Sequence, residues 1–125
     1  MAGTWNFIDQ FRVDGEQYMS GSDSGTYNNC QKISDLISTT GGALSVAPVT
    51  VANMQAFFLQ SDQICNIVFT LSTGSLTITL PANGAYSWSV NSGQANPFAH
   101  DIVSAVVNFT GPVTSVTITC RIATT

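Results

Sequence analysis

Apolar and polar residues alternate along most of this chain, which is the pattern of a half-buried β-strand. The clearest run is 113–123, in which every second residue from Val116 to Ile122 is apolar and threonines occupy much of the opposite face. Segments 64–71 and 75–80 repeat the pattern. Sustained helical periodicity is nearly absent, so the sequence predicts an all-β chain. The residues expected between packed sheets are Val116, Ile118, Cys120, Ile122, Leu76, Ile78, Ile67, Phe69 and Trp88.

Three further segments are read as strands. Residues 84–90 alternate with Tyr86, Trp88 and Val90 on one face, and the start alternates with Trp5, Phe7, Phe11 and Val13. Residues 53–60 fit a helical turn or a strand, and the strand is favoured. Asp9 interrupts the apolar face of the first strand. Either a β-bulge re-aims this carboxylate or a partner meets it there, and the bulge is favoured.

Turn-forming residues separate these runs at strand-length intervals. They are Asp14-Gly15, 20–25, Gly41-Gly42, Thr73-Gly74, Asn83-Gly84, 91–93 and Gly111-Pro112. Segments 71–76 and 81–84 predict hairpin turns, and 91–101 is a long loop. Eight to nine short strands predict one β-sandwich or jelly-roll domain over 1–125, with 1–25 as an extended or adaptable segment.

Charge is scarce in this chain. It holds three Lys and Arg residues and seven Asp and Glu residues, 8 % of the whole, where about a quarter is usual. A folded chain of this size exposes roughly 6,400 Å², so wide tracts of its surface must be neutral. Such a surface suits burial against copies of the same chain or a larger assembly. Three basic residues, far apart in sequence, do not make a nucleic-acid or membrane-binding footprint.

The sequence predicts no enzyme, no cofactor and no metal site. His100 beside Asp101 is the single imidazole; it has no nucleophile motif to serve and reads as a loop histidine. The widely spaced Cys30, Cys65 and Cys120 lack a CxxC motif, which predicts free thiols and no zinc site. Acidic stretches at 14–16 and 20–25 do not follow a calcium-loop pattern. The start of the chain lacks a signal-peptide pattern, which predicts synthesis and retention in the cytoplasm.

Several local patterns in the second half of the chain occur together. They are the run Phe-Phe-Leu-Gln-Ser-Asp-Gln at 57–63, the segment 76–80, the strand Tyr-Ser-Trp at 86–88, the loop ending Asn96-Pro97-Phe98, and the final Val-Thr-Ile-Thr-Cys-Arg-Ile. With them, residues 54–125 resemble small structural proteins of tailed bacteriophages. The resemblance implies a capsid decoration or cement protein on the capsid exterior. It would bind the major capsid protein shell and copies of itself, as a dimer or trimer, with no nucleic acid and no membrane as partner.

Loops and termini can adapt to a partner while a sandwich stays rigid. The candidate protein-contact residues therefore lie in 1–25 and 91–101: Trp5, Phe7, Asp9, Phe11, Asn96, Pro97, Phe98 and His100. The alternative function is a phage tail or fibre-associated β-sandwich module that recognises a glycan or receptor. Exposed aromatic residues would favour that alternative, because they could stack on sugars.

Overall fold

The computed structural model describes residues 2–13, 16–38 and 41–125, without the side chains of 8–13 and 16–22. These segments contain ten β-strands, one short 3-10 helix and no α-helix, which confirms the predicted all-β class. The strands are β1 (Gly3–Val13), β2 (Glu16–Tyr27), β3 (Asn29–Ser38), β4 (Gly41–Leu44), β5 (Met54–Ser61), β6 (Cys65–Leu71), β7 (Ser75–Leu80), β8 (Ala85–Ser89), β9 (Ile102–Asn108) and β10 (Ser115–Thr124). The helix is η1 (Val51–Asn53).

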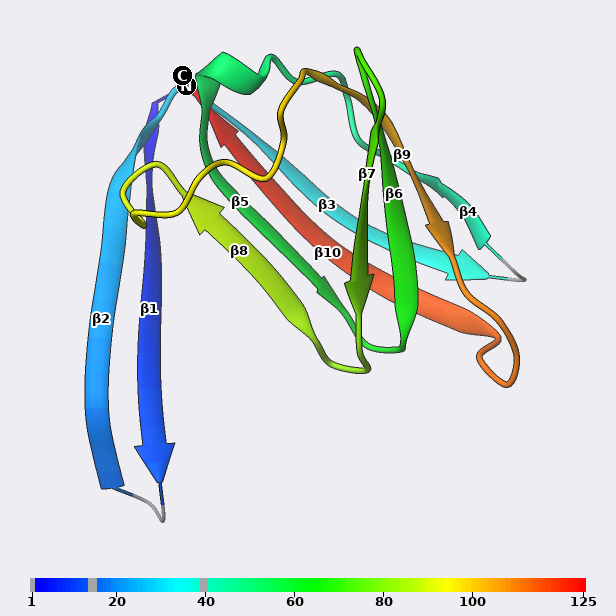
Figure 1. The fold of residues 1–125 in the computed structure, drawn as a ribbon, viewed down its shortest axis with the longest axis horizontal. Helices are drawn as coiled ribbons and strands as arrows, with labels where there is room; N and C mark the ends of the chain where they lie inside the picture. The colour runs from blue at the N-terminus through cyan, green and yellow to red at the C-terminus, as the bar shows by residue number, and fades with distance from the viewer. Residues whose placement is uncertain (1, 14–15, 39–40) are drawn as a thin grey trace.

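Eight of these strands form a sandwich of two antiparallel sheets, with the order β3-β10-β5-β8 in one and β4-β9-β6-β7 in the other (Figure 1). Their pairing is nested: β3 pairs with β10, β4 with β9, β5 with β8, and β6 with β7. The pairs therefore form one long antiparallel ribbon that is rolled up and joined along β10–β5 and β9–β6. This arrangement of eight strands is a jelly roll.

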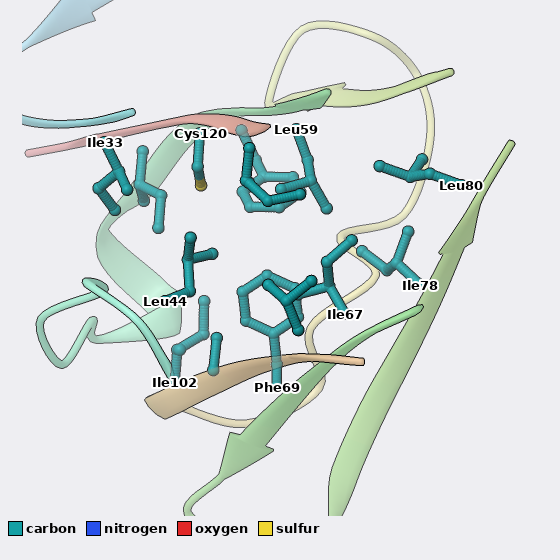
Figure 2. Packing of buried hydrophobic residues seen from close by; sticks show 14 of the residues in the cluster. Ile33, Leu44, Leu59, Ile67, Phe69, Ile78, Leu80, Ile102 and Cys120 are labelled. Atoms are coloured by element: carbon teal, nitrogen blue, oxygen red, sulfur yellow. The ribbon is translucent and has the colours of Figure 1, made fainter. Parts of the chain in front are cut away.

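One apolar cluster fills the space between the two sheets. Figure 2 shows Ile33, Leu59 and Cys120 of the first sheet facing side chains of the second, Phe69 and Ile102 among them. Eight of the nine residues predicted for this core are buried, and the ninth, Leu76, is partly buried against it. Burial of each large apolar side chain stabilises the fold by about 1.5–3 kcal/mol, so the alternating pattern specifies the sandwich.

Three sequence expectations are corrected by the strand pairing. Residues 20–25, predicted as a turn, belong to β2. Residues 81–84 do form a turn, in which Asn83 has a φ of 59°, but the turn joins two different sheets and is no hairpin. Val90 lies beyond the end of β8 and is 45 % exposed, because the chain turns away at 89–92.

Other expectations hold. Residues 54–61 are a strand, and 71–76 form the β6–β7 hairpin turn. The bulge predicted at Asp9 does not occur: Asp9 pairs regularly with Gly21, and the register of β1 shifts further on, between Phe11 and Arg12. The side chain of Asp9 and the Asp14-Gly15 turn lie outside the described residues.

Candidate functional site: the pocket beneath the N-terminal arm

Strands β1 and β2 form a separate two-stranded hairpin, called the N-terminal arm below. Figure 1 shows its base beside the end of β10 and its far end extending away from the sandwich. In the described part of the chain, neither strand pairs with a third one. A two-stranded hairpin alone is marginally stable in water, so the contacts at its base decide whether the arm holds its position.

Aromatic side chains of the arm lie over glycines of the opposite strand. Trp5 pairs with Gly25 and Tyr27 pairs with Gly3. A Cβ atom added to Gly25 would stand 2.7 Å from the indole of Trp5, and one added to Gly3 would collide with the ring of Tyr27. Glycine is thus required at both positions because the rings occupy the space where a side chain would be. The position of Gly25 beside the Trp5 ring explains how the glycine-rich segment 20–25 can belong to a strand.

The sheet beneath the arm is lined by small residues. Ala56 of β5 and Ala123 of β10 pair with each other, and each is only 4 % exposed although both lie outside the main core. They are covered by Trp5, which is 8 % exposed. One step along the arm, the ring centroids of Phe7 and Phe58 are 6.4 Å apart. The arm is therefore seated through aromatic rings on a shallow surface of alanines.

Polar contacts fix the same end of the arm. The hydroxyl of Ser89, which is fully buried, donates to Asp23 Oδ2 at 3.1 Å. The side-chain amide of Asn91 donates to the carbonyl oxygen of Ser24 at 2.8 Å. Buried polar groups are normally satisfied in this way. The contacts join β2 to β8 and to the 91–101 loop, so the two segments predicted to contact a partner touch each other.

A pocket of about 320 Å³ lies between the base of the arm and the sheet. Trp5, Phe7, Tyr27, Phe57 and Phe58 contribute its aromatic lining, and Lys32 and Arg121 are the charged residues among its described lining. No carboxylate occurs among the described lining residues. Its surroundings therefore combine apolar walls with positive charge.

The two cations face each other across neighbouring strands, since Lys32 of β3 pairs with Arg121 of β10. Arg121 is held by its Nη1 atom, which donates to the carbonyl oxygens of Ile33 and Cys120, each at 2.9 Å. Lys32 is exposed. Among the described residues, neither cation forms an ion pair. Like charges placed directly opposite each other are destabilising, so this pair is unfavourable until an anion approaches.

The indole N–H of Trp5 is the one buried side-chain polar atom in the described residues without a hydrogen-bond partner. The other indole, that of Trp88, donates to the carbonyl oxygen of Gln94 at 2.9 Å. An unsatisfied buried donor costs about 1–3 kcal/mol. The Trp5 ring therefore lines the pocket, while its N–H has no partner and is enclosed by the protein.

The structure separates the sequence-predicted contact residues. Trp5 and Phe7 meet in the pocket, where their ring centroids are 5.7 Å apart. The backbones of Asp9 and Phe11 lie further along β1, and their side chains are outside the description. In the 91–101 loop, Asn96 and Pro97 are half-buried and His100 is exposed.

Phe98, one of the predicted contact residues, lies inside the main core. It is 2 % exposed, and its ring centroid lies 5.0 Å from those of Phe57 and Phe69, in edge-to-face geometry. It therefore anchors the loop to the core and is not available to a partner in this fold. Sequence reasoning also missed Lys32 and Arg121 as neighbours, because a strand pattern reveals which face a residue takes but not which strand lies beside it.

The remaining candidate groups show no catalytic arrangement in the described segments. The three cysteines are free thiols. Burial raises the pKa of Cys120 to about 12, and burial also raises the pKa of Cys65. No cluster of three metal-ligating side chains occurs among residues 2–13, 16–38 and 41–125. Within the same segments, no helix has the length and apolar character needed to cross a membrane.

A second surface lies on the opposite side of the sandwich. The four strands β4, β9, β6 and β7 contain no charged residue. Their outward side chains are serines, threonines, asparagines and small apolar residues, with Val103 47 % and Val106 40 % exposed. This surface, called the neutral face below, spans an entire sheet.

Comparison with known proteins assigns neither surface. No protein-family model matches the chain, and no curated protein matches its sequence. The function is therefore argued from the two surfaces themselves.

Proposed function

We propose that this protein is a non-enzymatic virion structural protein, a capsid decoration or cement protein that binds the major capsid protein shell from outside and stabilises it. The observation that carries the proposal is the neutral face, a whole sheet without a charged residue. The sequence resemblance to structural proteins of tailed bacteriophages supports the same conclusion, and jelly rolls occur in viral capsids.

The neutral face suits a protein contact for a physical reason. Charged groups are depleted at the centres of interfaces, because each must lose its hydration when the surfaces meet. Here Val68, Val106 and Ala43 are aligned across three neighbouring strands, and Thr77 completes the row. Burial of this row removes apolar surface from water without burying a charge. We expect the contact to cover at least ~800 Å² per copy, as specific interfaces do.

The N-terminal arm supplies a second point of attachment in this proposal. Its base is fixed to the sandwich through Trp5 and Asp23, while its far end extends from the body (Figure 1). Both outer edges of its strands are without a ladder partner in the described residues. Two weak contacts on one molecule bind far more tightly than either alone, so a sheet face plus an arm would hold a small protein on a shell.

The proposal is tested by placing charge on the neutral face. We expect Thr77→Lys combined with Val106→Lys to leave the fold intact, since both side chains are exposed, and to remove the protein from particles purified by density gradient. Thr117→Lys is the matched control, an exposed position of the other sheet, and should leave particle association unchanged. Retention of particle association by the double variant, or absence of the unmodified protein from purified particles, would contradict the proposal.

A second candidate function is a tail or fibre-associated binding module that recognises a glycan or receptor. The pocket beneath the arm favours it, since the pocket is aromatic and positively charged. If recognition through this pocket is the main function, the variant with charges on the neutral face should still bind particles. The same experiment therefore separates the two functions.

A further inference from the structure

We infer that the pocket beneath the N-terminal arm binds a ring-sized molecule that carries a carboxylate group, the chemistry shared by acidic sugar units and aromatic acids. The inference rests on the pocket alone and does not depend on attachment to a shell. Its basis is the meeting of two cations, Lys32 and Arg121, with the aromatic rings of Trp5, Phe7 and Phe58 in one cavity.

The charge of the pocket selects an anion. The whole chain carries a formal charge of −4, so its acidic residues outnumber its basic ones, yet neither Lys32 nor Arg121 is paired with a described carboxylate. An incoming anion would relieve the repulsion between the two cations. Among the described lining residues it would also face no acidic group. The same two cations favour an anion over a neutral molecule.

The hydrogen-bonding groups point to a carboxylate. The Lys32 ammonium and the guanidinium of Arg121 can only donate hydrogen bonds. A carboxylate can only accept when ionised, and it offers two oxygens to such donors. One Arg121 nitrogen is already occupied by two backbone carbonyls, which leaves a small set of donors suited to two oxygens.

The size and walls of the pocket point to a ring. Ligand pockets usually measure ~300–1,000 Å³, and the 320 Å³ here lies at the lower end. Such a space holds one ring rather than an extended chain. Phe7 and Phe58 are only half-buried, so part of their apolar surface remains available to the flat side of a sugar or aromatic ring.

The test uses the intact protein and follows its two indole N–H signals by NMR. Glucuronic acid and benzoate are the probes, and glucose and benzyl alcohol are the matched neutral controls. We expect either acid to shift the Trp5 signal in a saturable manner, with a dissociation constant on the order of 0.1–1 mM. The Trp88 signal should stay in place, because that indole is bound to Gln94. Which acid binds more tightly identifies the sugar or the aromatic source.

Substitution of the exposed cation connects binding to the pocket. Lys32→Gln should weaken binding about three- to fivefold, the usual strength of one exposed ion pair, and Lys32→Glu should abolish it. Arg12→Gln removes an equal charge near the far end of β1 and should leave the affinity unchanged. An unmoved Trp88 signal in every variant shows that the fold persists.

Three results would overturn the inference. The first is an unmoved Trp5 signal at 20-fold the expected dissociation constant of both acids. The second is an equal response to glucose or benzyl alcohol. The third is a response to inorganic phosphate with none to either carboxylate. Each result is independent of whether the protein associates with particles.

Discussion

At the scale of single residues, most of the charged side chains that the structure describes form hydrogen bonds within the fold. Asp62 Oδ1 accepts a hydrogen bond from the backbone N–H of Thr117 at 2.8 Å. Asp101 Oδ1 accepts one from Val51 at 2.9 Å, and Arg121 binds backbone carbonyls. Composition alone predicted a sparsely charged surface. It could not predict that several charges are also engaged with the backbone, because their partners are up to 88 residues away in sequence.

Trp88 makes the largest contribution to the free energy of unfolding that we predict for a single side chain. Its side chain is 8 % exposed within the main core, and its N–H holds the 91–101 loop through Gln94. Trp88→Ala should lower the free energy of unfolding by ~3–5 kcal/mol in urea titration. Trp88→Phe keeps most of the apolar volume and should cost less. A loss below ~1 kcal/mol for the alanine variant would place Trp88 outside the core.

The thiols should differ sharply in reactivity. Only the thiolate reacts with disulfide reagents, and burial raises the pKa of Cys120 to about 12, far above neutral pH. Cys30 is half-buried, while Cys65 and Cys120 are buried. At pH 8 an aromatic disulfide reagent should modify Cys30 promptly and the other two only as the protein unfolds. Denatured, unreduced protein should show three modified thiols by intact mass; a single one would reveal a disulfide.

At the scale of elements, the alternating pattern predicted strands better than it predicted their partners. Alternate apolar side chains require one buried face in segments 113–123 and 75–80, and strands β10 and β7 form there. Residues 20–25 have no apolar alternation and form a strand only because β1 lies beside them. Residues 81–84 were assigned to a hairpin because turn chemistry is local. Whether the two strands joined by a turn belong to the same sheet depends on their pairing with strands that are distant in sequence.

The seat of the arm allows a prediction for the element as a whole. Trp5 rests on Ala56 and Ala123, so Ala123→Leu should displace the arm without opening the sandwich. Overpacking of this kind typically costs 1–3 kcal/mol. Limited proteolysis should then cut within residues 1–28 and leave a folded remainder. Ala43→Leu is the control, because Ala43 is exposed on the other sheet; equal protection of the arm in both variants would contradict the seating.

At the scale of the whole molecule, the arm increases the exposed surface. The molecule exposes 7164 Å², above the roughly 6,400 Å² that size scaling gives for a compact chain of this length. A hairpin with both edges free contributes surface without an equal share of core. The arm adds exposed surface, and the neutral face lacks charge. A partner would complement both properties. Neither property follows from the alternating strand pattern alone.

Salt should separate the two binding properties proposed for this molecule. Attachment through the neutral face involves no charged strand residue, so particle association should persist when salt is raised to 0.5 M. Carboxylate binding at Lys32 should weaken over the same range, because exposed charges are screened beyond about 10 Å already at 0.1 M. Cosedimentation with particles and the NMR titration provide the two measurements. A variant lacking residues 1–12 tests the arm, and its weaker but still salt-resistant cosedimentation would show that the sheet face carries the main contact. Release of the intact protein at moderate salt would instead make the contact ionic, which the charge-free sheet does not allow.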